Sequence, residues 1–197
     1  MTTGLRGEKD FTPAFPDIGA GPLAADPARA RNAPAGPTLG QRAFHNLRLL
    51  VAAVWLGSAV FFSAAVAPSA FAVLPSRELA GALVARTLTI VNVGGCVVGL
   101  FLLAGALVGR GGVKIPARLL ELLSLLTLAA ATGAGHWWIA ARMAALRVQM
   151  ARPIEEVAAD DPLRVAYNAL HGQSVTALSI AMIAGAVALL LIARRTK

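Results

Sequence analysis

The chain has 197 residues, of which 57% are hydrophobic and only 14% are charged, and its formal net charge is +8. An average soluble protein has roughly 25% charged residues, and a chain this apolar is not disordered throughout. The single cysteine, Cys96, excludes an internal disulfide and a cysteine zinc cluster. Basic nucleic-acid-binding proteins spread their charge over a soluble surface. This chain instead has long uncharged segments, so we expect no nucleic-acid partner.

Residues 1–40 are rich in proline, glycine and alanine, and they lack the apolar run of a secretory signal. This composition predicts a disordered N-terminal tail, and a docking tail is the alternative. Residues 41–197 form the predicted membrane domain.

Four segments of 20 or more residues contain no Asp, Glu, Lys or Arg: 49–76, 87–109, 122–141 and 165–193. A helix needs ~20 apolar residues to cross the hydrocarbon core of a bilayer, where the backbone must satisfy its own hydrogen bonds. We therefore predict an all-α integral membrane protein that folds as an antiparallel four-helix bundle. The predicted spans are residues 48–74, 87–109, 118–142 and 167–193.

The basic residues set the predicted orientation, because cytoplasmic loops carry an excess of Lys and Arg. One side of the bundle is flanked by Arg42, Arg48, Arg110, Lys114, Arg118, Arg194, Arg195 and Lys197. Six arginines flank the opposite side, where five acidic residues offset them. We expect a bacterial-type inner membrane, with both termini and the loop at 110–118 in the cytoplasm.

Small residues four apart let membrane helices approach closely. Each span has such a motif: Ala53 and Gly57, Gly95 and Gly99, Ala129 and Gly133, Ala181 and Gly185. These motifs predict close packing of all four spans, and the same motifs could serve a homodimer. Pro68 is expected to kink or end the first helix. The third helix is expected to continue toward Met150, and the fourth to begin at Asp161 and Pro162.

Polar groups inside a membrane are costly, so Glu121 and Asn92 are functional candidates. At 100° per residue, one face of the third helix carries Glu121, Ser124, Thr132, His136, Arg142 and Met143. This pattern predicts a polar stripe that faces the bundle interior. The alternative is that Ser and Thr bond to their own helix, with Glu121 and Arg142 at the interfaces. Glu121 is expected to pair with Arg118 at the interface.

His136 and His171 both fall toward the outer side, so they could meet, whereas His45 lies at the cytoplasmic side. Neutral imidazoles bind metal or haem, and two histidines with Met143 or Met150 would suit copper. The alternative is a pair of polar interfacial histidines, and no sequence feature requires a cofactor. Hydrolase and phosphate-loop motifs are absent from the sequence, so we expect a protein that is not an enzyme.

Two sequence blocks occur in a suggestive order: Trp55-Leu-Gly57 with Pro68 and Phe71, then Asp161-Pro162-Leu163-Arg164 with Leu170-His171. Over residues 44–193 the chain resembles a four-helix membrane family of unknown function that includes the transmembrane protein 205 group. The resemblance implies a fold and a membrane but no reaction. We predict a functional cluster on these blocks, made of Trp55, Gly57, Pro68, Phe71, Arg164 and His171.

The spacing from His45 to Trp55 and Gly57 is similar, more distantly, to the first helix of copper-resistance protein D and of membrane protoporphyrinogen oxidases. That resemblance implies a haem or metal role for His45.

Three functions therefore remain open. The leading one is a non-enzymatic accessory or interaction bundle that contacts lipid and either a second copy or another membrane protein. The others are a haem- or copper-binding redox or metal-handling protein, and a small transporter with Glu121 and His136 along its path.

Overall fold

The computed structural model of the chain describes residues 38–108 and 115–194. The predicted N-terminal tail lies outside the described residues, except for its last three positions. Much of the predicted cytoplasmic loop and the last three residues of the chain also lie outside them.

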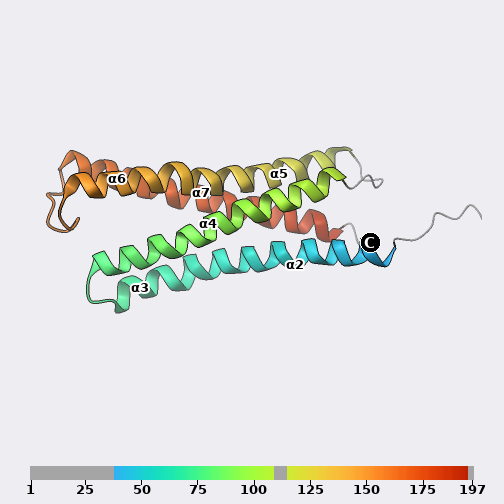
Figure 1. Cartoon of the computed structure of the whole chain (residues 1–197), viewed down its shortest axis with the longest axis horizontal. Coiled ribbons are helices and arrows are strands. Elements are labelled where there is room, and N and C mark those ends of the chain that lie inside the picture. Colours follow the sequence, from blue (N-terminus) through green and yellow to red (C-terminus); the bar gives the residue numbers. More distant parts are fainter. Residues whose placement is uncertain (1–37, 109–114, 195–197) are drawn as a thin grey trace, which may run out of the picture. The chain divides into compact units, whose positions relative to one another are not determined.

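Four helical rods make up the described part of the chain (Figure 1). Each rod is long and apolar enough to cross a membrane, and the described residues contain no strand. The all-α, four-helix prediction is confirmed. The elements in chain order are α2 Leu39–Phe61, η1 Phe62–Val66, α3 Ala67–Val73, α4 Arg77–Val108, α5 Ile115–Gly133, η2 Ala134–Ala140, α6 Ala141–Met150 and α7 Pro162–Ala193.

Successive rods run in opposite directions, so the start of α2, the end of α4, the start of α5 and the end of α7 share one end of the bundle (Figure 1). The rods form a ring in which α2 packs against α4 and α7, and α5 packs against the same two helices from the other side. The α2 rod is the least buried of the four. Its position in the bundle therefore depends on relatively few contacts.

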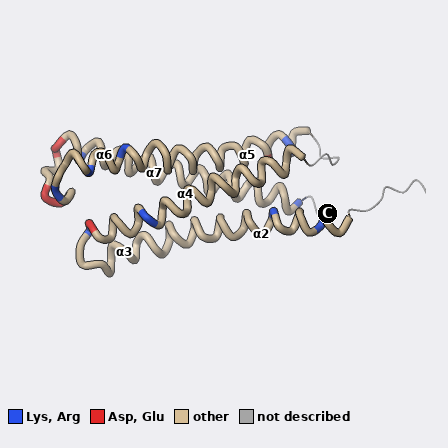
Figure 2. The backbone as a smooth tube through the Cα atoms, viewed as in Figure 1, with Lys and Arg blue, Asp and Glu red and all other residues tan. Residues whose placement is uncertain are grey.

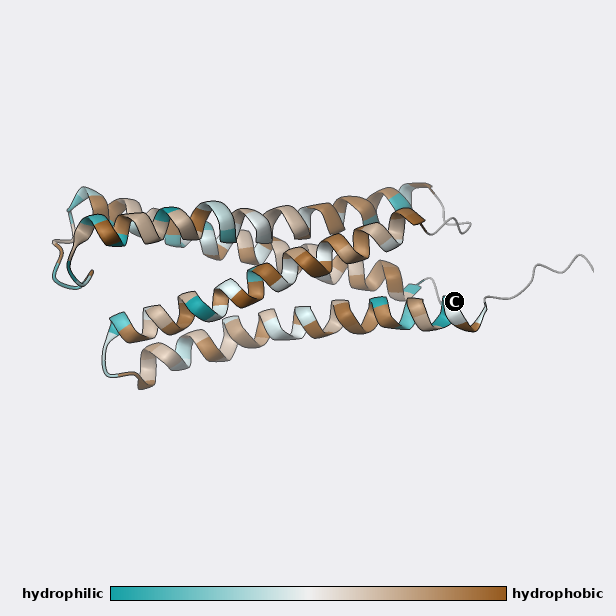
Figure 3. Cartoon of the chain, in the orientation of Figure 1, coloured by the Kyte–Doolittle hydropathy of each residue, from teal (hydrophilic) through white to brown (hydrophobic). Residues whose placement is uncertain are grey.

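Apolar residues, drawn in brown, recur along the length of all four rods (Figure 3), and many of the large ones are exposed. Val54, Phe61, Ile90 and Ile183 are each at least 60% exposed. A soluble protein rarely exposes apolar surface on this scale, whereas lipid solvates it without cost. The chain is therefore a multi-pass membrane protein.

The helix ends follow local side-chain chemistry. Thr38 and Gln41 form a capping box at the start of α2, and the Ser76 hydroxyl accepts a hydrogen bond from the Leu79 amide at the start of α4. Asp161 accepts from the Leu163 amide, with Pro162 at the first position of α7. The predicted start of the fourth helix is confirmed, and so is the extension of the third helix to Met150.

Two rods contain a wider, π-helical stretch, η1 in the first and η2 in the third. Pro68 follows η1 in the first turn of α3, and the wide turns of η1 accommodate a residue that has no amide proton to donate. The first rod consequently does not end at Pro68 but continues to Val73.

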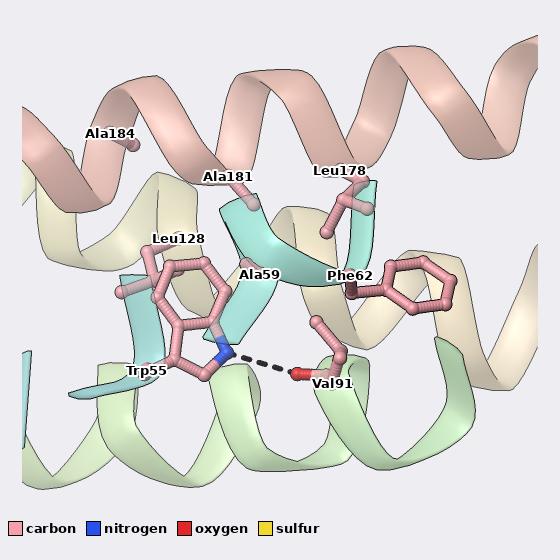
Figure 4. Close-up of a cluster of buried hydrophobic side chains, with 8 residues drawn as sticks. All are labelled: Trp55, Ala59, Phe62, Val91, Leu128, Leu178, Ala181 and Ala184. Atoms are coloured by element: carbon pink, nitrogen blue, oxygen red, sulfur yellow. Dashed lines mark hydrogen bonds between the residues drawn. The ribbon is translucent and has the colours of Figure 1, made fainter. Parts of the chain in front are cut away.

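The centre of the bundle is built around Trp55 (Figure 4). Its indole Nε1 donates a hydrogen bond to the Val91 carbonyl of α4 at 3.0 Å. Its ring occupies the space that side chains at Gly95 and Gly185 would fill, because a Cβ there would lie 2.8 Å and 2.9 Å from ring carbons. The residues of this cluster are Trp55, Ala59, Phe62, Val91, Leu128, Leu178, Ala181 and Ala184.

The small-residue motifs of the second, third and fourth spans take part in this packing. A Cβ at Gly99 would lie 3.1 Å from the Ala129 backbone nitrogen, and Ala181 is fully buried. The motif of the first span takes no part in the packing of the bundle. Ala53 and Gly57 are exposed, and a Cβ at Gly57 would meet no atom within 4 Å. The prediction of close packing at Gly57 within the bundle is therefore wrong, and a homodimer contact at this motif stays a prediction.

This difference predicts opposite effects of the same substitution. Gly95→Ala is expected to lower the free energy of unfolding by about 1–3 kcal/mol, because the new methyl overlaps Trp55 and Thr132. Gly57→Ala is expected to be neutral or to raise it by up to ~1 kcal/mol, since alanine is the better helix former. Detergent unfolding monitored by circular dichroism measures both. Equal losses in the two variants would contradict the packing.

Candidate functional site

A buried ion pair joins three helices at the end of the bundle where α2 begins. Arg48 Nη2 donates to Glu121 Oε1 at 2.8 Å and to the Leu102 carbonyl oxygen at 3.2 Å. Arg48 is 4% exposed and Glu121 is 0% exposed. The predicted pairing of Glu121 with Arg118 is therefore wrong, and so is the prediction that Arg48 is a flanking surface charge.

Arg48 reaches its partner through space that a glycine leaves open. A Cβ at Gly105 would lie 3.2 Å from Arg48 Nε and from the Phe44 ring. Phe44 packs edge-to-face on Phe101, with 6.1 Å between ring centres. Aromatic and aliphatic groups thus surround the guanidinium, and its Nε atom makes no hydrogen bond to any described residue.

In such an environment each charge depends on the other. A lone charge in the middle of a membrane protein is expensive, whereas a hydrogen-bonded pair offsets much of the cost of leaving water. The pair therefore favours the one arrangement of α2, α4 and α5 in which its members meet. We treat Arg48 and Glu121, with the Leu102 carbonyl, as the candidate functional site.

The other polar groups of the third rod bond locally. Thr132 donates to the Leu128 carbonyl at 2.7 Å, and Ser124 donates to the Leu120 carbonyl at 2.8 Å. The alternative that these hydroxyls bond to their own helix is thus confirmed, although Glu121 is buried and not interfacial. Asn92 is 3% exposed and packs against Gly135 of η2, where a Cβ would lie 2.9 Å from its Nδ2.

The predicted polar stripe faces the bundle interior at five of its six positions, and Arg142 is the exception. Glu121, Ser124 and Thr132 are buried, His136 is half-buried and Arg142 is exposed. The wider turns of η2 shift the angular position of every later residue. Arg142 consequently does not belong to the stripe, whereas Met143 is half-buried and packs against the cluster of Met150, Val157 and Tyr167.

His136 lies on η2 and packs edge-to-face on Trp137, and its buried Nδ1 has no hydrogen-bond partner among the described residues. His171 is exposed on α7. No group of three or more His, Cys, Asp or Glu side chains in the described part could hold a metal ion. A copper site made of two histidines and a methionine, and a haem role for His45, stay predictions.

The six residues of the predicted functional cluster come from three helices. Trp55 lies in the core and Gly57 faces outward. Pro68 and Phe71 lie on α3, which packs on α4. Arg164 of α7 donates to the Val157 carbonyl oxygen, and His171 is exposed. A shared functional role for these residues stays a prediction.

Sequence reasoning missed a second arginine contact, at the opposite end of the bundle. Arg147 Nε donates to the Tyr167 hydroxyl oxygen at 3.1 Å, and its guanidinium lies 5.2 Å from the ring centre. This contact ties α6 to α7 beside the cluster of Met150, Val157 and Tyr167. Both residues fall on predicted helical extensions, but no sequence pattern pairs them.

One family model matches the chain, a domain of unknown function (DUF4149), over residues 50–152. The match covers just over half of the chain, from after Arg48 through α4 and α6, and it leaves α7 outside. Neither the curated proteins nor the solved structures include a match. On the extent of the family match, the chain belongs to the family defined by this domain of unknown function.

Proposed function

We propose that this chain is a non-enzymatic membrane bundle that acts as an accessory or interaction protein for another membrane protein or for a second copy of itself. The observation that carries the proposal is the buried ion pair: Glu121 is fully buried and its carboxylate is engaged by Arg48. A bundle closed in this way offers its outer surface for recognition.

The closed interior argues against a transport path. Ionisable groups of a substrate path face a water-filled cavity, whereas Glu121 is enclosed between helices. Two cavities lie instead beside Met150, at the end of α6.

The haem or copper alternative has no observation in its favour beyond the histidines themselves. An absorption spectrum and metal analysis of the purified protein separate it from the proposal.

Photo-crosslinking in the membrane tests the proposal directly. A photoreactive residue at Gly57, which faces outward on the least buried rod, is expected to give a discrete protein adduct. The matched control places the same residue at Leu123, which is 51% exposed on α5. Two results together would overturn the proposal in favour of a transporter. Crosslinking would give lipid adducts and no protein adduct at both positions, and the protein would support a solute flux that Glu121→Gln abolishes.

The same proposal places the bundle in a bacterial-type inner membrane with both termini in the cytoplasm. Support comes from the charges. Among the described residues, Arg42, Arg118 and Arg194 lie at the end where α2 begins, and the acidic residue there, Glu121, is buried. The opposite end mixes basic and acidic residues (Figure 2). Reporter fusions after Lys197 check this orientation.

Kinship with the transmembrane protein 205 group is likewise a proposal, and it rests on the two sequence blocks around Trp55 and Asp161.

A further inference from the structure

A cavity of about 370 Å³ lies at the end of the bundle away from the buried ion pair. It opens where the start of α4 meets the end of α6 and the segment that follows. Figure 2 shows basic and acidic positions gathered at this end. The charged residues of its wall are Arg77, Glu78, Arg147, Arg152 and Glu155.

The guanidinium groups of Arg77 and Arg152 are available to a ligand. Among the described residues, Arg77 and Arg152 make no hydrogen bond or ion pair, and Glu78 and Glu155 come within 4.0 Å of none of the described arginine or histidine nitrogens. The carboxylates thus leave the arginine donors open. They remain at the wall as acceptors for hydroxyl or ammonium groups.

Arg147 is held in place before any ligand arrives. Its guanidinium donates to the Tyr167 hydroxyl oxygen, stacks over that ring, and lies beside Gly81, where a Cβ would be 3.3 Å from Nη2. A planar guanidinium whose position is fixed loses little entropy on binding, and its fork matches the oxygens of a phosphate group.

Apolar surface reaches the end of the bundle at which the cavity lies. Phe71 and Val73, at the end of the first rod, are exposed, and Arg77 follows Val73 after a turn of three residues. A phosphate group can therefore reach the three arginines either from water or from a lipid headgroup.

We propose that this cavity binds the phosphate group of a phosphate ester, with Arg77, Arg147 and Arg152 holding the phosphate and Glu78 and Glu155 accepting from the other polar groups of the ligand. The site is independent of the proposed interaction function, and neither depends on the other. The same phosphate chemistry occurs in lipid headgroups, so the experiment must separate the two sources.

The experiment titrates the purified full chain in neutral detergent with glycerol 3-phosphate, with inorganic phosphate and, as the unphosphorylated control, with glycerol. A second arm measures binding of the same chain to phosphatidylcholine vesicles with and without phosphatidylglycerol. The test variant is Arg77→Gln with Arg152→Gln, two exposed residues with no described partner to lose. The control variant is Arg142→Gln, which removes an exposed arginine that lies over Trp138 and outside the cavity.

We expect saturable binding of glycerol 3-phosphate that the double variant weakens by about tenfold or more, since each charge-assisted hydrogen bond contributes on that order. Arg142→Gln should bind as the wild type does, with unchanged helix content in all variants. Binding only to anionic vesicles, lost in the double variant, would support phosphate recognition with lipid as its source. No saturable binding, or equal binding by the double variant, would overturn the proposal.

Discussion

Replacing Glu121 by leucine is expected to lower the free energy of unfolding by about 3–5 kcal/mol. The substitution leaves Arg48 buried, at 4% exposure, with the Leu102 carbonyl oxygen as its one remaining acceptor among the described residues. Removing both charges, as Arg48→Met with Glu121→Leu, is expected to restore stability to within about 1 kcal/mol of the wild type, because no uncompensated charge remains. Unfolding by sodium dodecyl sulfate in mixed micelles, followed by circular dichroism, measures all three proteins.

The control is Arg118→Gln, which removes a neighbouring arginine from the same helix as Glu121. Its expected effect is within about 0.5 kcal/mol, as for most surface substitutions. If Arg118→Gln destabilises the protein as much as Glu121→Leu, the pairing between α2 and α5 is not the stabilising contact. A double variant as unstable as the single one would contradict the charge argument itself.

Trp55→Ala is expected to cost about 3 kcal/mol of unfolding free energy, the lower end of the range for truncating a buried tryptophan. The ring fills the space beside Gly95 and Gly185, so its loss leaves a cavity between α2, α4 and α7. The lower end applies because lipid is as apolar as the core, and only the packing term is lost. Trp55→Phe keeps most of the packing and loses the hydrogen bond to Val91, so about 1 kcal/mol is expected.

Trp137→Ala provides the matched control, since the Trp137 side chain is 62% exposed. We expect a change of no more than about 0.5 kcal/mol in the same unfolding measurement. Similar losses at Trp55 and Trp137 would show that general tryptophan anchoring at the membrane surface, and not core packing, dominates.

The spans were predictable because lipid imposes a simple rule on composition: charge disappears wherever a helix crosses the hydrocarbon. The cap at Asp161 and Pro162 was predictable for an equally local reason, since its hydrogen bond joins residues two apart. Long-range partners carry no such signature. Arg48 and Glu121 are separated by 73 positions, and a lone arginine before an apolar run resembles an ordinary flanking charge.

A helical-face argument would have placed Arg48 in the interior. Arg48, Ala52, Trp55 and Ala59 follow one another at spacings of three or four residues, and all are buried in the structure. The sequence thus contained the signal for burial of Arg48 but not the identity of its partner. Gly57 was misplaced for the opposite reason, because a small-residue motif indicates that close packing is allowed without indicating the face on which it occurs.

The wide helical stretch η2 determines how the third rod responds to a change in its length. A π-helical stretch takes up one extra residue within an α-helix. Removing one residue from positions 134–140 would therefore let an ordinary α-helix form there and leave α6 close to its present orientation. Arg147 would still reach Tyr167, and Met150 would stay in the small core at that end. A single-residue deletion in this stretch should be tolerated far better than one in an ordinary α-helical stretch, which turns everything that follows by about 100°.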